Sequence, residues 1–280
     1  MIITAMLIWG SIGIFRRYIP WSSAALACYR GLVGALFLLV LVKLRGRELL
    51  HGTDTRTRGL LLLSGAFIGL NWILLFESFN YTTIPTATLC YYMEPTLVVL
   101  LSPIFFKERL TPKKILCTLV ALLGMACIAG VFETGIPPLA ELKGILFGLA
   151  AGLVYAGVVI LNKKLPGIDA YEKSFLQIGA AGLALVPYVL LTGQEYSWEL
   201  SPLVISMLVI VGLVHTGVAY ALYFGSMDGL KTQSIAIISY LDPISALVLS
   251  ALVLGETMTM YGIIGAVLIL GAAFCLEQDV

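Results

Sequence analysis

Few ionisable side chains lie inside the long apolar runs of this chain, and two of them are carboxylates that each precede a proline. Glu94 stands before Pro95, and Asp242 stands before Pro243. A proline removes one helix hydrogen bond and frees the carbonyl four residues earlier. A carboxylate beside such loosened backbone could bind a substrate ammonium group or carry a coupling proton. The alternative is a structural acid that is hydrogen-bonded between the two halves of the chain.

Two basic side chains within these runs are further candidates. His215 could relay protons near neutral pH or bond to a substrate, or it could be a satisfied polar side chain on a packed helix. Arg30 could receive a substrate carboxylate through two parallel hydrogen bonds. For Arg30 we expect a buried ion pair or a side chain that reaches to the membrane surface, because a lone charge in lipid is costly.

Aromatic rings and one amide in the same runs could contact a substrate directly. Rings stack on apolar groups and attract ammonium groups, and an asparagine adds a donor and an acceptor. The candidates are Trp9, Asn71, Trp72, Tyr91, Tyr92, Tyr155, Tyr220, Tyr223 and Tyr240. Taken alone, each aromatic residue is better explained by helix packing or by an interfacial aromatic belt. No metal site and no cofactor is expected.

The elements that must position these side chains are membrane helices. Of the 280 residues, 60% are hydrophobic and 12% are charged, whereas soluble domains have roughly 45–50% and ~25%. A soluble fold could not cover so apolar a core with 17 basic and 16 acidic side chains, so much of the surface must face lipid. The net charge of +1 suggests no polyanionic partner such as nucleic acid.

Charge clusters and proline or glycine turns divide the chain into ten candidate spans. They run over residues 2–19, 22–42, 60–79, 84–106, 115–132, 142–161, 171–191, 203–227, 234–254 and 261–276. Backbone polar groups in lipid must be satisfied internally, so runs of this length indicate helices rather than barrel strands. The first span is the weakest, because its apolar run stops at Phe15, before Arg16 and Arg17.

The basic residues predict the orientation of these spans. If the N-terminus is cytoplasmic, the outside loops hold Arg16, Arg17 and Lys143, and the inside loops hold thirteen basic residues. These thirteen are Lys43, Arg45, Arg47, Arg56, Arg58, Lys107, Arg109, Lys113, Lys114, Lys163, Lys164, Lys173 and Lys231. Such a bias places both termini inside. Glu108 and Glu256 are expected to end their spans on the cytoplasmic side, as pairing or gating acids.

An internal repeat relates the two halves of the chain. The stretch Tyr-Met-Glu-Pro at 92–95 recurs as Tyr-Leu-Asp-Pro at 240–243, an offset of 148 residues that also brings Glu108 onto Glu256. The repeat favours Tyr92 and Tyr240 over the unpaired aromatic candidates. Each copy, 1–134 and 135–280, holds five spans, and an odd number makes the second copy enter from the opposite side. Inverted repeats are typical of secondary transporters, whose substrate site lies between the halves.

These features resemble the EamA family of the drug/metabolite transporter superfamily. The resemblance rests on the ten spans, the Trp9-Gly10 pair, and the two acid-proline pairs, each followed thirteen residues later by a glutamate. It implies a ten-helix fold of two inverted five-helix units that moves small metabolites, often exporting amino acids or related compounds. It also implies a central cavity at the segments that carry the aromatic candidates.

We therefore predict a multi-pass secondary transporter of the bacterial inner membrane that acts as a monomer on a small-molecule substrate. Its coupling or gating candidates are Glu94, Glu108, His215, Asp242 and Glu256. An intramembrane enzyme is the first alternative, but the sequence has no HExxH or GxSxG motif. A channel is the second, but it would favour rings of identical side chains.

Overall fold

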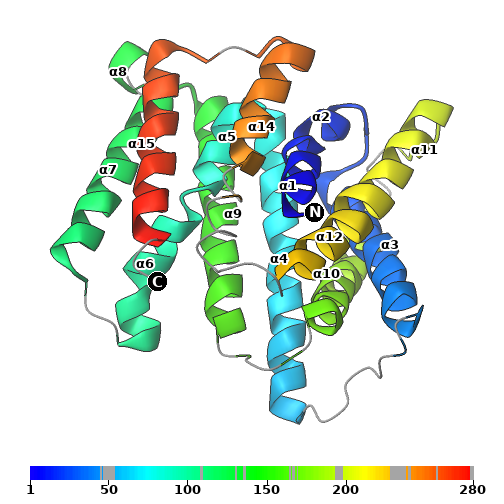
Figure 1. Ribbon diagram of the computed structural model, residues 1–280. Helices are drawn as coiled ribbons and strands as arrows, with labels where there is room; N and C mark the ends of the chain where they lie inside the picture. Colours follow the sequence, from blue (N-terminus) through cyan, green and yellow to red (C-terminus); the bar gives the residue numbers. More distant parts are fainter. Residues whose placement is uncertain are drawn as a thin grey trace.

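The computed structural model describes most of the chain. The described residues are 1–44, 46, 54–107, 110–129, 131–134, 137–163, 165, 168, 170–192, 198–227, 238, 241–256 and 258–277. All regular structure within them is helical, and these residues contain no strand (Figure 1). The described part of the chain is therefore all-α, as the composition predicts.

The described helices are divided between the two halves of the chain. The first half contains α1 (Ile2–Gly10), α2 (Ile12–Arg17), α3 (Ser23–Leu44), α4 (Thr55–Tyr81), α5 (Ile84–Tyr91), α6 (Glu94–Phe106), α7 (Pro112–Ile128) and α8 (Val131–Thr134). The second half contains α9 (Leu139–Lys163), α10 (Ala170–Thr192), α11 (Pro202–Val209), the π-helix η2 (Ile210–Val218), α12 (Ala219–Met227), α14 (Leu241–Leu249), the π-helix η3 (Ser250–Leu254) and α15 (Met260–Glu277). Every predicted span overlaps at least one of these helices.

Six helical stretches in the described residues are long and apolar enough to cross a membrane. They are Ser23–Leu44, Thr55–Tyr81, Ile84–Phe105, Leu139–Asn162, Tyr171–Leu191 and Pro202–Tyr223. Two shorter apolar stretches, Leu241–Leu254 and Met260–Cys275, follow towards the C-terminus. Many large apolar side chains on these helices are exposed, as lipid-facing surfaces require.

Side-chain caps explain where several helices begin. The side chain of Asp54 accepts a hydrogen bond from the backbone N–H of Thr57, and Thr83 does the same for Thr86. Such caps satisfy one of the four unpaired N–H groups at a helix start. Asp54 therefore lets α4 begin at Thr55, several residues before the predicted span.

Interruptions divide the helices that reach the centre of the molecule. Ser11 separates α1 from α2, and Tyr92 and Met93 separate α5 from α6. The second break follows from Pro95, which lies in the first turn of α6, where a missing N–H leaves no helix bond unmade. In η2, the wider turns of a π-helix replace the α-helix for nine residues. Single-turn π-bulges are frequent at functional sites.

The most extensive helix packing joins the two halves of the chain. The pairs are α3 with α10, α4 with α9 and α10, α7 with α15, α3 with η2, α1 with α14 and α12, and α5 and α6 with α9. Figure 1 shows α7 and α15 side by side at one edge, with α1, α14 and α5 near the centre. Each of these pairs takes one helix from 1–134 and one from 139–277.

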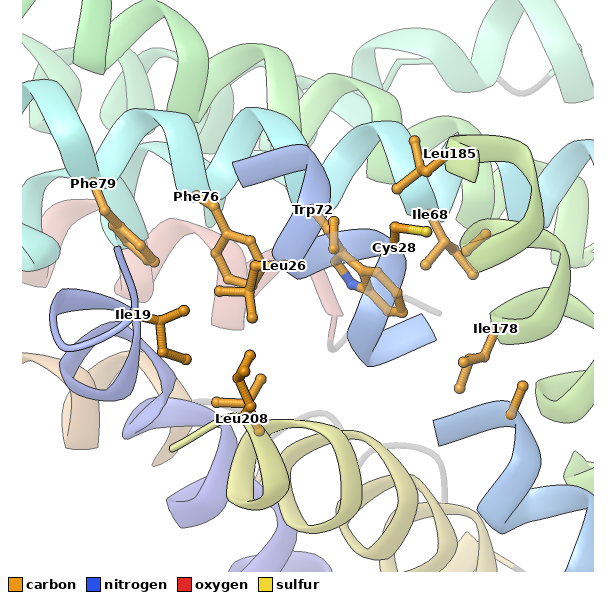
Figure 2. Close-up of a cluster of buried hydrophobic side chains, with 14 of the residues drawn as sticks. Ile19, Leu26, Cys28, Ile68, Trp72, Phe76, Phe79, Ile178, Leu185 and Leu208 are labelled. Carbon is orange, nitrogen blue, oxygen red and sulfur yellow. The ribbon is translucent and has the colours of Figure 1, made fainter. Parts of the chain in front are cut away.

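A buried apolar cluster holds α3, α4, α10 and α11 together. Trp72, Phe76 and Phe79 of α4 lie among Leu26 of α3 and Leu208 of α11, as Figure 2 shows. Small residues bring other helices close: a Cβ atom added to Gly124 of α7 would lie 2.8 Å from the carbonyl oxygen of Gly265 in α15. Glycine on such faces lets membrane helices pack at short distance.

Candidate functional site

The two acid-proline segments meet at the interface between the halves. The hydroxyl of Tyr92, just after α5, donates a hydrogen bond of 2.9 Å to Oδ2 of Asp242 in α14. The Asp242 carbonyl also accepts a hydrogen bond from the Ser245 hydroxyl at 2.9 Å. Glu94 begins α6 two residues after Tyr92 and is half-buried. A hydrogen bond thus joins one residue of the first repeat-related segment to one residue of the second.

The first span packs against the π-helix through His215. Trp9 donates from its indole nitrogen to the His215 carbonyl oxygen at 2.9 Å, and the Ser11 hydroxyl lies 2.9 Å from His215 Nε2. The Phe15 ring contacts the imidazole edge-on, with ring centres 4.7 Å apart. His215 Nδ1 lies 3.4 Å from the Ile210 carbonyl oxygen. The buried imidazole therefore has partners on both nitrogens, as a satisfied polar side chain would.

Aromatic candidates form two groups at this interface. Trp9 contacts the rings of Tyr220 and Tyr223, with ring centres 4.9 and 5.2 Å apart. Tyr91 contacts Tyr92 at 5.5 Å, and it contacts Tyr155 at 5.7 Å. The structure thus brings together six of the eight candidate rings.

Asn71 and Trp72 lie side by side in sequence but point to different neighbours. Asn71 is buried and donates from its side-chain amide to the Ala151 carbonyl at 2.8 Å, which ties α4 to α9. Trp72 lies under the Arg30 guanidinium, whose central carbon is 4.3 Å from the centre of the indole. Asn71 thus makes a hydrogen bond between two helices, whereas Trp72 makes a cation–π contact with Arg30.

Arg30 makes no ion pair with any described residue, so the expectation of a buried ion pair or a surface-reaching side chain is wrong. Its Nε donates to Thr216 Oγ1 at 3.0 Å, and its guanidinium stacks on Trp72. The residue is 4% exposed. Glu77, the acid of α4, instead accepts from Ser23 and Asn80 near the end of the helix. Cation–π stacking takes the place of the expected ion pair, because the indole face of Trp72 lies directly beneath the guanidinium charge.

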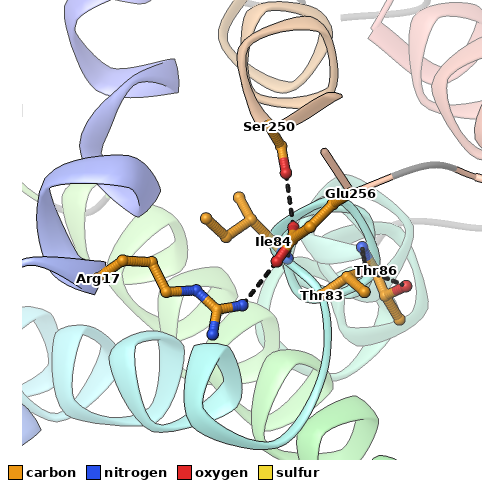
Figure 3. Close-up of polar contacts among 6 residues, drawn as sticks. All are labelled: Arg17, Thr83, Ile84, Thr86, Ser250 and Glu256. Atoms are coloured by element: carbon orange, nitrogen blue, oxygen red, sulfur yellow. Dashed lines mark hydrogen bonds and ion pairs between the residues drawn. The ribbon is translucent and has the colours of Figure 1, made fainter. Parts of the chain in front are cut away.

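Glu256 closes a polar cluster at one end of the bundle (Figure 3). Its Oε1 lies 2.7 Å from Nη2 of Arg17, and its Oε2 accepts from the Ser250 hydroxyl at 2.6 Å and from the Ile84 backbone N–H at 3.0 Å. These contacts join α2, the start of α5 and the start of η3 to Glu256, which lies two residues beyond the end of η3. We call the group of Arg17, Ile84, Ser250 and Glu256 the clasp.

The clasp contradicts the expectation that Arg17 and Glu256 lie on opposite sides of the membrane. Arg17 is predicted to face outside and Glu256 to face the cytoplasm, but the two form an ion pair and must share one end. The error is geometric: if the second copy is inverted, the end of its fourth span lies opposite the end of the fourth span of the first copy. Glu108 and Tyr240 lie outside the described residues.

Hydroxyl side chains complete the interface, and the sequence does not single them out. Ser11, Thr216 and Ser245 hydrogen-bond His215, Arg30 and the Asp242 carbonyl respectively. Serine and threonine are common in membrane helices, where they bond their own backbone, so their types carry little signal. Among the described residues, no three His, Cys, Asp or Glu side chains gather as metal ligands would.

Replacing Glu256 by Gln is expected to loosen the clasp. The change removes the ion pair and weakens the bonds from Ser250 and the Ile84 N–H, a loss of about 1–3 kcal/mol. Ser11→Cys supplies a reporter near the interface, and its reaction with a membrane-impermeant thiol reagent added from the Arg17 side should become about tenfold faster. Ser250→Ala, which removes one bond only, should give a smaller increase. An unchanged rate in Glu256→Gln would show that the clasp does not limit access of the reagent to position 11 from this end.

Comparisons with known proteins agree with this architecture. The EamA-like transporter family matches the chain twice, over residues 1–130 and 142–277. The uncharacterized transporter YxxF of Bacillus subtilis (strain 168) is 32% identical over an alignment of 273 residues that covers 95% of this chain and 85% of that protein. The uncharacterized inner membrane transporter YicL of Salmonella typhimurium (strain LT2) is 24% identical over 292 residues, covering 99% of this chain and 94% of that protein.

Two further comparisons concern a named substrate and a fold. The biotin transporter of Escherichia coli (strain K12) is 27% identical over 229 residues, which are 80% of this chain and 73% of that protein. A solved crystal structure superposes with a TM-score of 0.66 at 18% identity, covering 97% of this chain and 93% of the other, and shares the fold.

With six helices of membrane-spanning length, these matches make the chain a multi-pass protein of the cell inner membrane. The family and the named relatives are transporters, which points away from an enzyme and towards small molecules as substrates. The chain belongs to the EamA-like transporter family.

Proposed function

We propose that the chain is a secondary transporter whose two inverted five-helix repeats, 1–134 and 135–280, give alternating access to a substrate site between them. Both termini face the cytoplasm, and one chain supplies both halves, so a monomer suffices. The observation that carries the proposal is the hydrogen bond between Tyr92 and Asp242, which joins the repeat-related segments at the interface. Substrate sites of inverted-repeat transporters lie at such interfaces.

The packing pattern supports the inverted repeat. An exchange of halves replaces α1–α2 by α9, α3 by α10, α4 by α11–η2–α12, α5–α6 by α14–η3, and α7 by α15. Under this exchange the pairs α3–α10 and α7–α15 map onto themselves. The pair α4–α10 maps onto η2–α3, α1–α14 maps onto α9–α5, and α4–α9 maps onto α12–α1. The two separate family matches also support a duplication.

The clasp supports an outward-closed conformation. Arg17 lies at the end of the bundle that the basic residues predict to be outside, and the clasp joins helices from both halves at that end. Nearby, Trp21 donates to the Glu199 carbonyl at 3.0 Å and its ring contacts Trp198. Alternating access then requires these contacts between halves to break when the outer side opens.

Amino acids and related small metabolites are the proposed substrates, and export is the proposed direction. The aromatic groups around Trp9 and Tyr91 suit an apolar or aromatic side chain. The name of the relative from Escherichia coli adds biotin as a compound to be tested.

The test is a metabolite panel in cells that overproduce the protein, followed by flux in proteoliposomes. We expect one or more compounds to reach a higher concentration in the medium of these cells than in the medium of cells that produce the Tyr92→Phe variant. For any such compound, flux into proteoliposomes should saturate with concentration, and unlabelled compound inside should accelerate uptake of label. Flux that rises linearly without exchange would favour a channel, and chemical conversion of the compound would favour an enzyme.

A further inference from the structure

Arg30 carries a charge deep in a membrane helix. It lies in α3 seven residues after Ser23, about 10 Å along the helix axis, and is 4% exposed. Ionisable residues at such depth are rare and almost always pair with another group or mark a substrate path. The contacts of Arg30 therefore decide what it does.

A second buried arginine shows how the terminal nitrogens of a guanidinium are satisfied in this protein. Arg16 donates from Nη1 to the Ile19 carbonyl at 2.8 Å, and from Nη2 to Asn80 Oδ1 at 3.3 Å and Ser23 Oγ at 3.4 Å. Both of its terminal nitrogens thus have oxygen partners. These contacts give Arg16 a structural role.

Arg30 differs from Arg16 at these same nitrogens. Its hydrogen bond with a described residue uses Nε, which donates to Thr216, and neither Nη nitrogen has a partner among the described residues. The structure fully encloses three unpaired side-chain polar atoms in the described residues, which are Arg16 Nε, Thr82 Oγ1 and Thr96 Oγ1. The Nη nitrogens of Arg30 are not among them, so they retain accessible surface.

The contacts that Arg30 does make hold its guanidinium plane in place. The indole of Trp72 lies against one face at 4.3 Å, Phe76 lies at 5.5 Å, and Thr216 of η2 fixes the Nε edge. The edge that carries Nη1 and Nη2 has no partner among the described residues. Two parallel N–H groups on a fixed plane match the two oxygens of a carboxylate, which arginine binds in a bidentate manner.

Arg30 lies at the interface already described, because its partner Thr216 follows His215 in η2. Tyr220 interacts electrostatically with both Arg30 and Asp242, and Tyr91 interacts with Arg30, Glu94 and Asp242. The ring of Tyr220 also contacts Trp9. A molecule bound at the Arg30 edge would therefore lie next to the two aromatic groups of the interface.

We infer that Arg30 binds the carboxylate of the transported molecule through Nη1 and Nη2, so that the substrates are small monocarboxylates. The inference rests on the proposed transport function. A bound carboxylate supplies the anion that Arg30 lacks, so the loaded protein buries a neutral pair where the empty protein holds a lone cation. This charge balance favours enclosure of a carboxylate over that of its amide or of an amine.

The test compares acids with their carboxamides on purified protein in lipid nanodiscs. The probes are the twenty proteinogenic amino acids and biotin, each with its matched carboxamide. Binding is measured by the thermal unfolding midpoint with a dye that reacts with the buried cysteines, such as Cys28 and Cys90, and then by titration. At least one acid should bind, and its amide should bind at least ~10-fold more weakly.

Two variants separate recognition from folding. Arg30→Gln should bring the acid-to-amide affinity ratio close to one, and Arg30→Lys, which keeps the charge without the planar fork, should leave an intermediate ratio. A structural role would weaken acid and amide equally and leave the ratio unchanged, which would overturn the inference. The midpoints of both variants without ligand report folding.

Three further outcomes would overturn either the inference or the proposed function. A panel in which no acid binds, or in which an amide binds as well as its acid, overturns the inference. Saturable transport of a compound without a carboxylate at full rate in Arg30→Gln overturns it while leaving the transporter intact. Absence of saturable transport for every compound contradicts the proposed function itself.

Discussion

Replacement of Asp242 by Asn is expected to abolish substrate accumulation driven by a pH gradient while leaving exchange of substrate for substrate. Asparagine has nearly the shape of aspartate, and its carbonyl can still accept the hydrogen bond that Tyr92 donates at 2.9 Å. It cannot take up or release a proton. If Asp242 carries the coupling proton, accumulation should fall by about tenfold or more, since an ionisable group in the membrane interior is then absent.

The measurement uses inside-out membrane vesicles with an acidic lumen, and exchange is measured without a gradient. Tyr92→Phe is the complementary control, because it removes the hydrogen bond that Asp242→Asn can keep, and it leaves the carboxyl group in place. Its transport rate should change, but the dependence of accumulation on the gradient should remain. His215→Gln should also retain that dependence, since His215 is held by Ser11 and the Ile210 carbonyl. Full gradient-driven accumulation in Asp242→Asn would exclude this carboxyl group as the proton carrier.

Replacement of Gly10 by Ala is expected to disrupt the packing of α1 on α14. A Cβ atom at this position would overlap Ser245 Oγ and lie 2.6 Å from the Asp242 carbonyl oxygen. The carbonyl belongs to the backbone and cannot turn away, so α1 must shift and carry Trp9 away from His215. Overpacking of this kind costs about 1–3 kcal/mol. The unfolding midpoint should fall, and transport should fall with it.

Gly271→Ala is the matched control, because nothing lies within 4 Å of the Cβ atom that it would add. It should leave the midpoint and the transport rate unchanged. Ser245→Gly combined with Gly10→Ala should restore part of the loss, since it removes the hydroxyl but not the carbonyl. A wild-type midpoint and rate in Gly10→Ala would show that α1 does not pack on α14 at this distance.

Local rules predict the helices and one of the central breaks. The apolar runs predict the helices because chains in lipid must pair their backbone groups internally. Pro95 predicts the loosened turn after Tyr91, because proline has no backbone N–H to donate to the Tyr91 carbonyl. Pro103 and Pro187 show the limit of the rule, because each lies inside a continuous helix, α6 or α10.

Contacts between distant segments determine what the sequence does not predict. The break at Ser11 and the π-helix at Ile210–Val218 contain no proline, and their contacts, Trp9 and Ser11 with His215, join residues more than 200 positions apart. The partner of Arg30 is an indole rather than an acid, which only the packing of α3 on α4 reveals. Glu256 is a different case, because an inverted second repeat, which the sequence already predicts, would place it at the same end of the bundle as Arg17, with which it pairs.

The π-helix η2 determines how far α12, the helix that follows it in the eighth span, is rotated about the helix axis. Each residue of a π-helix advances less about the axis than in an α-helix, so a nine-residue π segment sets the direction in which α12 presents Tyr220 and Tyr223. An α-helix turns by about 100° per residue. A return of this segment to α-helical winding with all nine residues kept would add rotation at each residue, and it would turn both tyrosines away from Trp9 without changing any of the three side chains. The winding of this segment is thus as much a part of the interface as the identity of its residues.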